Sequence, residues 1–216
     1  MSRPIRAGLT FFALVLLAVG LSVVLPYMTV SASGIPPEAQ RHRAQLVREA
    51  RFQFGLDAPV STLAAQIHQE SRWNSSAVSP AGAQGLAQFM PSTAAWMPKI
   101  DRRTGEPLPF NPAWAMRALC SYDKWLLDRV RGATLCDRWH FALAAYNGGL
   151  GWVQRDQRMT AEAGLDPLQW QYVRLFNAGR SAANFRENRG YAPRILGPLT
   201  NLYRVAGWGK GGCNVD

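Results

Sequence analysis

The spacing of apolar side chains predicts a mainly helical protein. Over residues 38–54 the apolar positions recur at helical spacing, and Gly55 follows as a stop. In the next such pattern Leu63, Ile67 and Glu70 fall at i, i+4 and i+7, which puts a carboxylate on the same helix face as two aliphatic side chains. Asn, Ser, Pro and Gly residues follow soon afterwards and end this helix. Glu70 is therefore predicted to lie near a helix C-terminus, on a face that packs inward.

The middle of the chain is predicted to be less regular. Residues 77–85 are mostly small or turn-forming, which indicates a short hairpin or loop. A short helix is expected over 86–90, just before a proline, and Ser92 is suited to cap another helix over 93–97. A glycine and two prolines mark 100–111 as a loop.

The second half of the chain returns to helical patterns. Helices are predicted over three ranges: 112–130, 137–147 and 184–203. The pair Gly148–Gly149 ends the second of them, and Pro193 and Pro198 must kink or split the third. The long segment 154–180 has a helical core over 167–176 and is interpreted as a lid or a partner surface.

An apolar stretch near the start indicates export from the cytoplasm. Arg3 and Arg6 precede a nearly unbroken apolar run over 7–25, which is long enough to span a bilayer. The positive end should stay in the cytoplasm, so the rest of the chain reaches the periplasm or the exterior. Three fates remain open for the segment: a cleaved signal peptide, an inner-membrane anchor, or an anchor that later leaves the membrane.

Charge and aromatic content narrow the class of partner. The formal net charge is +10, but Lys and Arg are scattered and no nucleic-acid-binding motif is present, so nucleic acid is not expected as a partner. An acidic polymer outside the membrane fits better, since a positive surface raises the rate of encounter with it. Eight Trp, nine Phe and six Tyr supply a core, and some of these rings are available to line a carbohydrate groove.

The cysteines and histidines do not indicate a metal site or a cofactor. Three Cys residues lie at 120, 136 and 213, without a C-x-x-C motif, and the three His residues lack metal-ligand spacing. His68 and Glu70 have the H-x-E form of a zinc deaminase, but its P-C-x-x-C partner is missing. A Cys120–Cys136 disulfide and two buried thiols remain equal alternatives, with Cys213 as the odd thiol.

The predicted position of Glu70 has a chemical consequence. Removal from water and the negative end of the helix dipole both disfavour the charged carboxylate, so both should raise its pKa. A carboxyl with a raised pKa keeps its proton near neutrality and can act as an acid. The plainer interpretation is a partly exposed Glu at a helix end.

Motifs around and beyond Glu70 favour the catalytic interpretation. Ser71 follows Glu70 directly, and further motifs occupy 79–80, 85–88 and 90–94. The stretch A-A-Y-N-G-G at 144–149 looks like A-Y-N-A-G, and E-N-R-G-Y at 187–191 looks like E-T-R-G-Y. In this order they resemble the soluble lytic transglycosylases, lysozyme-like enzymes that cleave peptidoglycan glycan strands. The resemblance covers about residues 60 to 203.

The resemblance implies a fold and a domain organisation. The fold would be mainly α, a lysozyme-like domain with a small loop or β-hairpin lobe, preceded by the apolar signal or anchor segment. The boundaries expected are 1–32 for that segment, 33–59 for a linker and N-terminal helix, 60–206 for the catalytic domain and 207–216 for a flexible tail.

The resemblance also implies site residues. Glu70 would be the catalytic acid and base, and either Ser71 or Ser79 would orient a hydroxyl or acetamido group, with Ser79 favoured because it precedes a proline. The substrate-binding positions are Ser71, Ser79, Gln88, Met90, Tyr146, Asn147, Glu187 and Tyr191. Glu187 is in addition the best candidate for a second carboxyl, since Glu70 is the only acidic residue between Asp57 and Asp101.

The implied reaction cleaves the bond between N-acetylmuramic acid and N-acetylglucosamine and leaves a 1,6-anhydromuramyl end without using water. The alternatives are a water-using muramidase of goose-lysozyme type and a catalytically silent, membrane-tethered peptidoglycan-binding module. The expected partners are peptidoglycan glycan strands and, if residues 7–25 stay uncleaved, the inner membrane. The sequence leaves the setting open between phage lysis, a secretion or conjugation machine, and wall remodelling.

Overall fold

A computed structural model describes residues 34–213 of the 216-residue chain. The predicted signal or anchor segment over 1–32, with its apolar run over 7–25, lies outside the described residues. Between residues 34 and 213, no helix is both long enough and apolar enough to cross a membrane.

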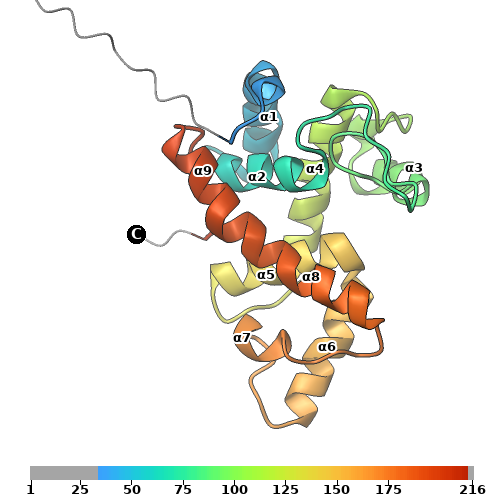
Figure 1. The fold of residues 1–216 in the computed structure, drawn as a ribbon, viewed down its shortest axis with the longest axis vertical. Coiled ribbons are helices and arrows are strands. Elements are labelled where there is room, and N and C mark those ends of the chain that lie inside the picture. Colours follow the sequence, from blue (N-terminus) through green and yellow to red (C-terminus); the bar gives the residue numbers. More distant parts are fainter. Residues whose placement is uncertain (1–33, 214–216) are drawn as a thin grey trace, which may run out of the picture. The chain divides into compact units, whose positions relative to one another are not determined.

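Helices make up most of the described part, as the sequence predicts (Figure 1). The α-helices are α1 (Pro37–Phe54), α2 (Val60–Ser71), α3 (Pro91–Ile100), α4 (Pro112–Leu127), α5 (Leu135–Gly148), α6 (Leu150–Glu162), α7 (Trp170–Val173), α8 (Ala182–Arg194) and α9 (Thr200–Val205). A 3₁₀ turn, η1 (Arg102–Thr104), and a π-helical turn, η2 (Ile195–Leu199), complete them. Within residues 34–213, β-structure is limited to two isolated antiparallel bridges, Val78–Gln84 and Gln84–Phe89.

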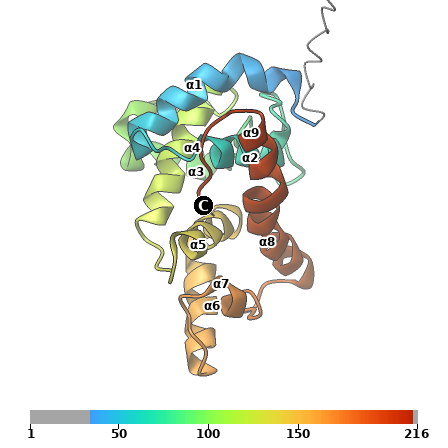
Figure 2. The ribbon, with the colours of Figure 1, turned by 90° about the vertical axis from the view of Figure 1, so that its left-hand side faces the viewer.

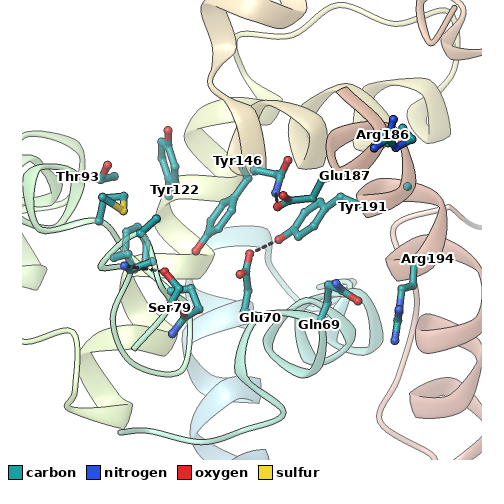
Figure 3. Close-up of a pocket in the computed structure, with 17 residues that line it drawn as sticks. Gln69, Glu70, Ser79, Thr93, Tyr122, Tyr146, Arg186, Glu187, Tyr191 and Arg194 are labelled. Atoms are coloured by element: carbon teal, nitrogen blue, oxygen red, sulfur yellow. Dashed lines mark hydrogen bonds between the residues drawn. The ribbon is translucent and has the colours of Figure 1, made fainter. Parts of the chain in front are cut away.

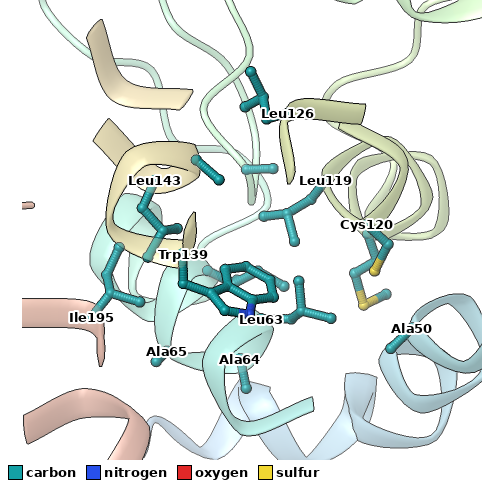
Figure 4. Close-up of a cluster of buried hydrophobic side chains, with 14 of the residues drawn as sticks. Ala50, Leu63, Ala64, Ala65, Leu119, Cys120, Leu126, Trp139, Leu143 and Ile195 are labelled. Carbon is teal, nitrogen blue, oxygen red and sulfur yellow. The ribbon is translucent and has the colours of Figure 1, made fainter. Parts of the chain in front are cut away.

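The helix α2 lies at the centre of this domain. It contacts α1, η2 and α9, and its side chains Leu63 and Ile67 are fully buried. Figure 4 shows Leu63, Ala64 and Ala65 of α2 facing side chains from α1, α4 and α5. Burying each large aliphatic side chain contributes about 1.5–3 kcal/mol, so the packing of this face fixes the position of α2 and of Glu70 in its last turn.

The last helical run crosses from α5 to α2. Helix α8 packs against α5, whereas η2 and α9 pack against α2. The run stays continuous through Pro193 and is interrupted by the π-helical turn that contains Pro198. Because a proline lacks the backbone N–H of a regular helix, a local change of winding accommodates it. The predicted split near the prolines is confirmed, and the crossing brings α8 over the end of α2.

The predicted helix over 86–90 is wrong. These residues form a tight turn closed by the bridge between Gln84 and Phe89, and Gln88 has a left-handed backbone with φ of 49°. Gly85 must be glycine, because a Cβ there would lie 1.8 Å from the carbonyl oxygen of Pro109. Its N–H donates to the carbonyl of Ala77 at 2.9 Å. Residues 77–90 therefore form a small loop that is held by two β-bridges, the bridged loop. The sequence predicts such a loop for 77–85.

Other helix boundaries also differ from prediction. Helix α3 begins at Pro91 without a side-chain cap, so Ser92 does not cap it, and it continues beyond 97 to Ile100. Helix α5 begins two residues earlier than predicted because Thr134 and Asp137 form a reciprocal capping box.

The long segment 154–180 is helical at a different place from the one predicted. Its main helix is α6, which ends at Glu162, and only one turn, α7, forms within 167–176. Backbone N–H groups there donate to aspartate side chains instead of to helix carbonyls. The N–H of Leu168 donates to the Asp166 carboxylate at 2.9 Å, and the N–H of Trp170 donates to Asp137 Oδ1 at 2.9 Å.

The C-terminal segment is packed as far as residue 213, which corrects the expectation of a flexible tail there. Cys213 forms a disulfide with Cys136 of α5, so the considered Cys120–Cys136 pairing is wrong, and Cys120 is a buried free thiol. The N–H of Gly212 donates to Thr62 Oγ1 at 2.9 Å, and the side chain of Trp208 is buried. Figure 2 shows this segment turning back from α9 past α2 toward α5.

Candidate active site

A polar cleft of about 590 Å³ lies over the C-terminal end of α2 (Figure 3). Its walls come from α2, the bridged loop, α3, α4, α5 and α8. Of the nine site residues expected from the sequence, eight line it: Glu70, Ser79, Gln88, Met90, Tyr146, Asn147, Glu187 and Tyr191. The fold therefore brings into one cleft side chains as far apart in sequence as Glu70 and Tyr191, which are separated by 121 positions.

Glu70 lies in the last turn of α2, and Arg72, which caps the helix after Ser71, has a left-handed backbone. Burial raises the pKa of Glu70 to about 8, and the negative charge of Glu187 acts in the same direction. A hydrogen bond from the Tyr191 hydroxyl to Glu70 Oε1 opposes this rise, because it stabilises the carboxylate. At neutral pH Glu70 is mostly protonated and faces the cleft, so it is able to act as an acid.

Helix α8 supplies two site residues from one face. Tyr191 is buried, and its hydroxyl points at Glu70 in Figure 3. Glu187, one turn earlier, is exposed and accepts a hydrogen bond from Asn147 Nδ2 at 3.1 Å. Asn147 Oδ1 in turn accepts from Asn188 Nδ2 at 2.9 Å, which ties the end of α5 to α8. The predicted i, i+4 placement of Glu187 and Tyr191 is thus realised in the cleft wall.

Tyr146 lines the cleft with its ring, and its hydroxyl hydrogen is already used in a hydrogen bond within the protein. Its O–H donates to the Ala87 carbonyl at 2.8 Å, and burial raises its pKa well above the usual range. The ring lies against Phe89 and Tyr122, with centroids 5.8 and 5.3 Å away. Tyr146 therefore fixes the bridged loop against α5, and its oxygen can still accept a hydrogen bond from a ligand.

The bridged loop presents Ser79, Gln88 and Met90 to the cleft. Ser79 Oγ accepts from the Ala83 N–H at 3.0 Å, which leaves its hydroxyl hydrogen to donate elsewhere. Gln88 Nε2 donates to the Gly85 carbonyl at 2.8 Å, so its amide holds the turn while its side chain lines the cleft. Met90 is 40% exposed, and its side chain lines the cleft.

Ser71 is the one expected site residue that lies outside this cleft. Its hydroxyl donates to the Leu86 carbonyl at 2.8 Å and does not line the cleft. Ser71 therefore anchors the bridged loop to the end of α2.

Several cleft residues are not among the site residues that the sequence predicts. Tyr122 of α4 lines the cleft beside Tyr146. Arg186 and Arg194 flank Glu187 and Tyr191 on α8 and bring positive charge to the same wall (Figure 3). Arg186, Gly190 and Arg194 are four residues apart, and this spacing predicts that the two arginines share a helix face.

A second buried carboxyl lies below the cleft. Asp123 of α4 is fully buried and accepts from Gln66 Nε2 at 3.3 Å. Burial raises its pKa well above the usual range, and it does not line the cleft. Among the described residues, Glu70 and Glu187 are thus the carboxyl groups that a ligand in this cleft can reach.

One group in the described part has the composition of a metal site. The side chains of Cys136, His140 and Cys213 lie close enough to share an ion. The two sulfurs are joined in a disulfide, so they do not offer thiolates to a metal.

The fold and the cleft define a class of protein: a helical domain that presents a half-buried carboxyl with a raised pKa to a polar cleft. The family model Transglycosylase SLT domain matches residues 46–168, which is more than half of the chain. The chain belongs to this family.

Curated relatives carry the name membrane-bound lytic murein transglycosylase F. The protein from Shewanella frigidimarina is 37% identical over 113 residues, covering 52% of this chain and 22% of the relative. The one from Mannheimia succiniciproducens is 33% identical over 158 residues, covering 66% of this chain and 31% of the relative. The chain spans less than a third of the length of these relatives.

Solved structures with a similar fold include two lytic transglycosylases. The 70 kDa soluble lytic transglycosylase SLT70 from Escherichia coli has a TM-score of 0.59 at 26% identity, covering 78% of this chain and 25% of that chain. An inactive Glu-to-Gln mutant of the lytic transglycosylase Slt from Pseudomonas aeruginosa has a TM-score of 0.57 at 26% identity, covering 81% of this chain and 26% of that chain.

Proposed function

We propose that this protein is a peptidoglycan lytic transglycosylase in which Glu70 is the single acid and base. The observation that carries the proposal is the Glu70 carboxyl, which opens on a polar cleft and has a pKa of about 8. Membership of the SLT family and the names of the relatives support the reaction class.

The proposed reaction begins with proton donation. Glu70 protonates the glycosidic oxygen between N-acetylmuramic acid and N-acetylglucosamine, and the bond to the anomeric carbon breaks. The resulting carboxylate is stabilised by the hydroxyl of Tyr191. Glu70 then takes the proton of the muramyl 6-hydroxyl as that oxygen attacks the anomeric carbon. The product is a 1,6-anhydromuramyl end, and no water is consumed.

The other cleft residues are proposed to bind the glycan. Ser79 has a hydroxyl hydrogen to donate to an acetamido or hydroxyl oxygen. The groove is completed by Gln88, Met90, Tyr146, Asn147 and Tyr191. The bulgecin A complex of the 70 kDa soluble lytic transglycosylase, with a TM-score of 0.53 to this chain, supports a ligand-binding groove in this fold.

A water-using muramidase remains the second candidate, because Glu187 lines the same cleft. Its carboxylate is exposed and is held by Asn147. A second carboxylate in this position could activate a water molecule, as in inverting glycosidases. The two functions differ in their products, since only hydrolysis leaves reducing ends.

Mass spectrometry of muropeptides tests the proposal. The full-length protein is incubated with purified sacculi, and the released fragments are compared with those released by Glu70→Gln. Anhydromuramyl ends, lighter than reducing ends by one water, support the transglycosylase. Reducing ends make the protein a muramidase. Binding to sacculi without any release by the unmodified protein leaves a tethered binding module.

The location follows from the same proposal. Peptidoglycan lies outside the cytoplasmic membrane, and the relatives are named membrane-bound. We place the domain over 60–206 in the periplasm, preceded by the linker and helix over 33–59. Residues 7–25 would attach it to the inner membrane if they are uncleaved. Association with secretion, conjugation or phage-lysis machinery remains a hypothesis.

A further inference from the structure

A pair of buried polar side chains lies beneath the catalytic cleft. Gln66 is one helical turn before Glu70 on α2, so the two residues share a face of that helix. Gln66 Nε2 donates to Oδ1 of Asp123 on α4 at 3.3 Å, and both side chains are fully buried. This contact joins α2 to α4 one turn before the acid.

Each partner of this pair has a second oxygen without a hydrogen bond. Asp123 Oδ2 and Gln66 Oε1 are both buried, and neither has a donor among the described residues. Both atoms are acceptors when Asp123 is ionised, so they cannot bond to each other. Unpaired buried acceptors are rare, and they are most costly when the group carries a charge. One proton on Oδ2 removes this cost, because it turns that oxygen into a donor.

Asp156 provides a contrast within the same domain. It is also fully buried, but its Oδ2 accepts from Arg180 at 2.7 Å and from Arg189 at 2.6 Å. Two cations therefore stabilise the charged form of Asp156. The partner of Asp123 is a neutral amide in place of a cation, so the pair does not stabilise a carboxylate by charge.

The other groups around Asp123 also favour its neutral form. Burial raises the pKa of Asp123 well above the usual range, and the negative charge of Glu70 acts in the same direction. The hydrogen bond from Gln66 opposes the rise. The remaining titratable groups within electrostatic reach are a thiol and three phenols: Cys120 and Tyr122 on α4, Tyr146 on α5 and Tyr191 on α8. None of these neighbours is a cation.

We propose that Asp123 is a protonated acid that closes a reciprocal pair with Gln66 and thereby positions Glu70. The Asp123 Oδ2–H donates to Gln66 Oε1 while Gln66 Nε2 donates to Asp123 Oδ1, so both unpaired oxygens are satisfied. The pair holds α2 against α4 and keeps the floor of the cleft uncharged. Asp123 is a positioning residue, because it acts through α2 and does not line the cleft. The inference rests on the proposed function, since it takes Glu70 as the acid.

Asp123→Asn tests the protonation, because an amide also offers one donor and one acceptor to Gln66. In the unfolded chain an aspartate ionises above about pH 4, whereas Asp123 keeps its proton in the folded protein. The folded state then binds more protons than the unfolded state, so the unmodified protein loses stability as the pH rises. Asparagine does not titrate. Asp123→Asn should therefore melt with the unmodified protein near pH 4 and at a temperature higher by roughly 5 °C or more near pH 7.

Asp156→Asn is the matched control, because it replaces another fully buried carboxylate by an amide. It leaves Arg180 and Arg189 without their anion, so it should melt below the unmodified protein near pH 7. Opposite signs for the two variants would separate a protonated from a charged carboxyl.

Steady-state kinetics test the effect on Glu70. Asp123→Asn should keep kcat/KM and the position of its alkaline limb, because no charge is removed. Asp123→Leu has a similar size but no hydrogen bonds, so it should lower kcat/KM by about tenfold or more well below its melting temperature. A movement of the alkaline limb of Asp123→Asn to lower pH would overturn the inference, since it would show that a negative charge near Glu70 had been lost. Unchanged kcat/KM in Asp123→Leu would overturn the positioning role.

Infrared spectroscopy locates the proton directly. In the Glu70→Gln background near pH 7, the absorption of a protonated carboxyl group should be present, and Asp123→Asn on that background should remove it. Absence of this absorption, or destabilisation near pH 7 by Asp123→Asn, would overturn the inference. The infrared and melting measurements need no turnover, so their failure is distinct from a failure of the product analysis that tests the proposed function.

Discussion

Tyr191 of α8 donates a hydrogen bond to Glu70 at the end of α2, and the two residues are 121 positions apart in the chain. The contact exists because the run from α8 through α9 crosses from α5 to α2 and passes over the cleft. It couples the protonation of the acid to the position of α8. In the proposed reaction the same hydroxyl stabilises the carboxylate formed by the first proton transfer.

Tyr191→Phe should change the pH dependence of cleavage in a defined direction. The hydrogen bond lowers the pKa of Glu70 from the value that burial alone would give, so its loss should raise that pKa. Because the acid must be protonated, activity falls as the pH rises through about 8 in the unmodified protein, and this limb should move to higher pH in the variant. The rate on the plateau should drop by roughly tenfold, since one charge-assisted hydrogen bond is lost.

The measurement is a profile of kcat/KM against pH for both proteins. Movement of the alkaline limb to lower pH would contradict the direction assigned to this hydrogen bond. Far-UV circular dichroism at each pH separates an effect on the acid from unfolding.

Much of this site was predictable because local patterns encode it. The spacing of Leu63, Ile67 and Glu70 is a property of one helix, and it placed Glu70 near a helix end, where the structure has it. The same holds for Glu187 and Tyr191, whose four-residue spacing predicts a shared face. Local spacing does not show that these two helix faces meet, because that depends on packing between distant helices. The order of the motifs, through the family resemblance, is what indicated it.

The failures have a common physical origin in tertiary contacts. The turn over 86–90 is imposed by bridge pairing and by the close approach of Pro109 to Gly85, neither of which is local. Ser71 is a polar residue directly beside Glu70, as expected of a residue that binds substrate, but its hydroxyl donates to the Leu86 carbonyl. The pairing of Cys136 with Cys213 brings together residues 77 positions apart, and spacing alone does not select it over a pairing with Cys120.

The corrected place of Ser71 leads to a paired test with Ser79. Ser71→Ala removes an anchor of the bridged loop and should lower the free energy of unfolding by about 1 kcal/mol, with a loss of activity that follows the stability. Ser79→Ala also removes a hydrogen bond, the one from the Ala83 N–H, and should lower the melting temperature by a similar small amount. Well below the melting transition it should still reduce kcat/KM, since Ser79 lines the cleft. Thermal melts and steady-state kinetics on both variants distinguish these outcomes; a reversed pattern would restore Ser71 as a ligand residue.

Reduction of the Cys136–Cys213 disulfide should destabilise the end of the domain that supports α2. The closed loop is long, and loss of such a cross-link costs about 2–5 kcal/mol. We expect Cys213→Ser to melt at a temperature lower by roughly 5 to 15 °C. The unmodified protein treated with a dithiol reductant should have the same melting temperature as the variant. The melting temperature of the variant itself should not change when the reductant is added. Identical melting of the oxidised protein and Cys213→Ser would show that the packed contacts of Trp208 and Gly212 suffice without the bond.

Glu187→Gln distinguishes a one-carboxyl from a two-carboxyl reaction. In the proposed mechanism Glu187 binds Asn147 and raises the pKa of Glu70 by its negative charge, but it transfers no proton. Its neutral amide should therefore lower the pKa of Glu70 slightly, move the alkaline limb to lower pH and reduce the rate by less than about tenfold. Glu70→Gln should reduce the rate by roughly a thousandfold or more, since the positioned proton donor is lost. Steady-state rates of the two variants on purified sacculi, with melting temperatures as a control for folding, give the comparison. Losses of equal size would mean that Glu187 activates water, and the released fragments should then carry reducing ends.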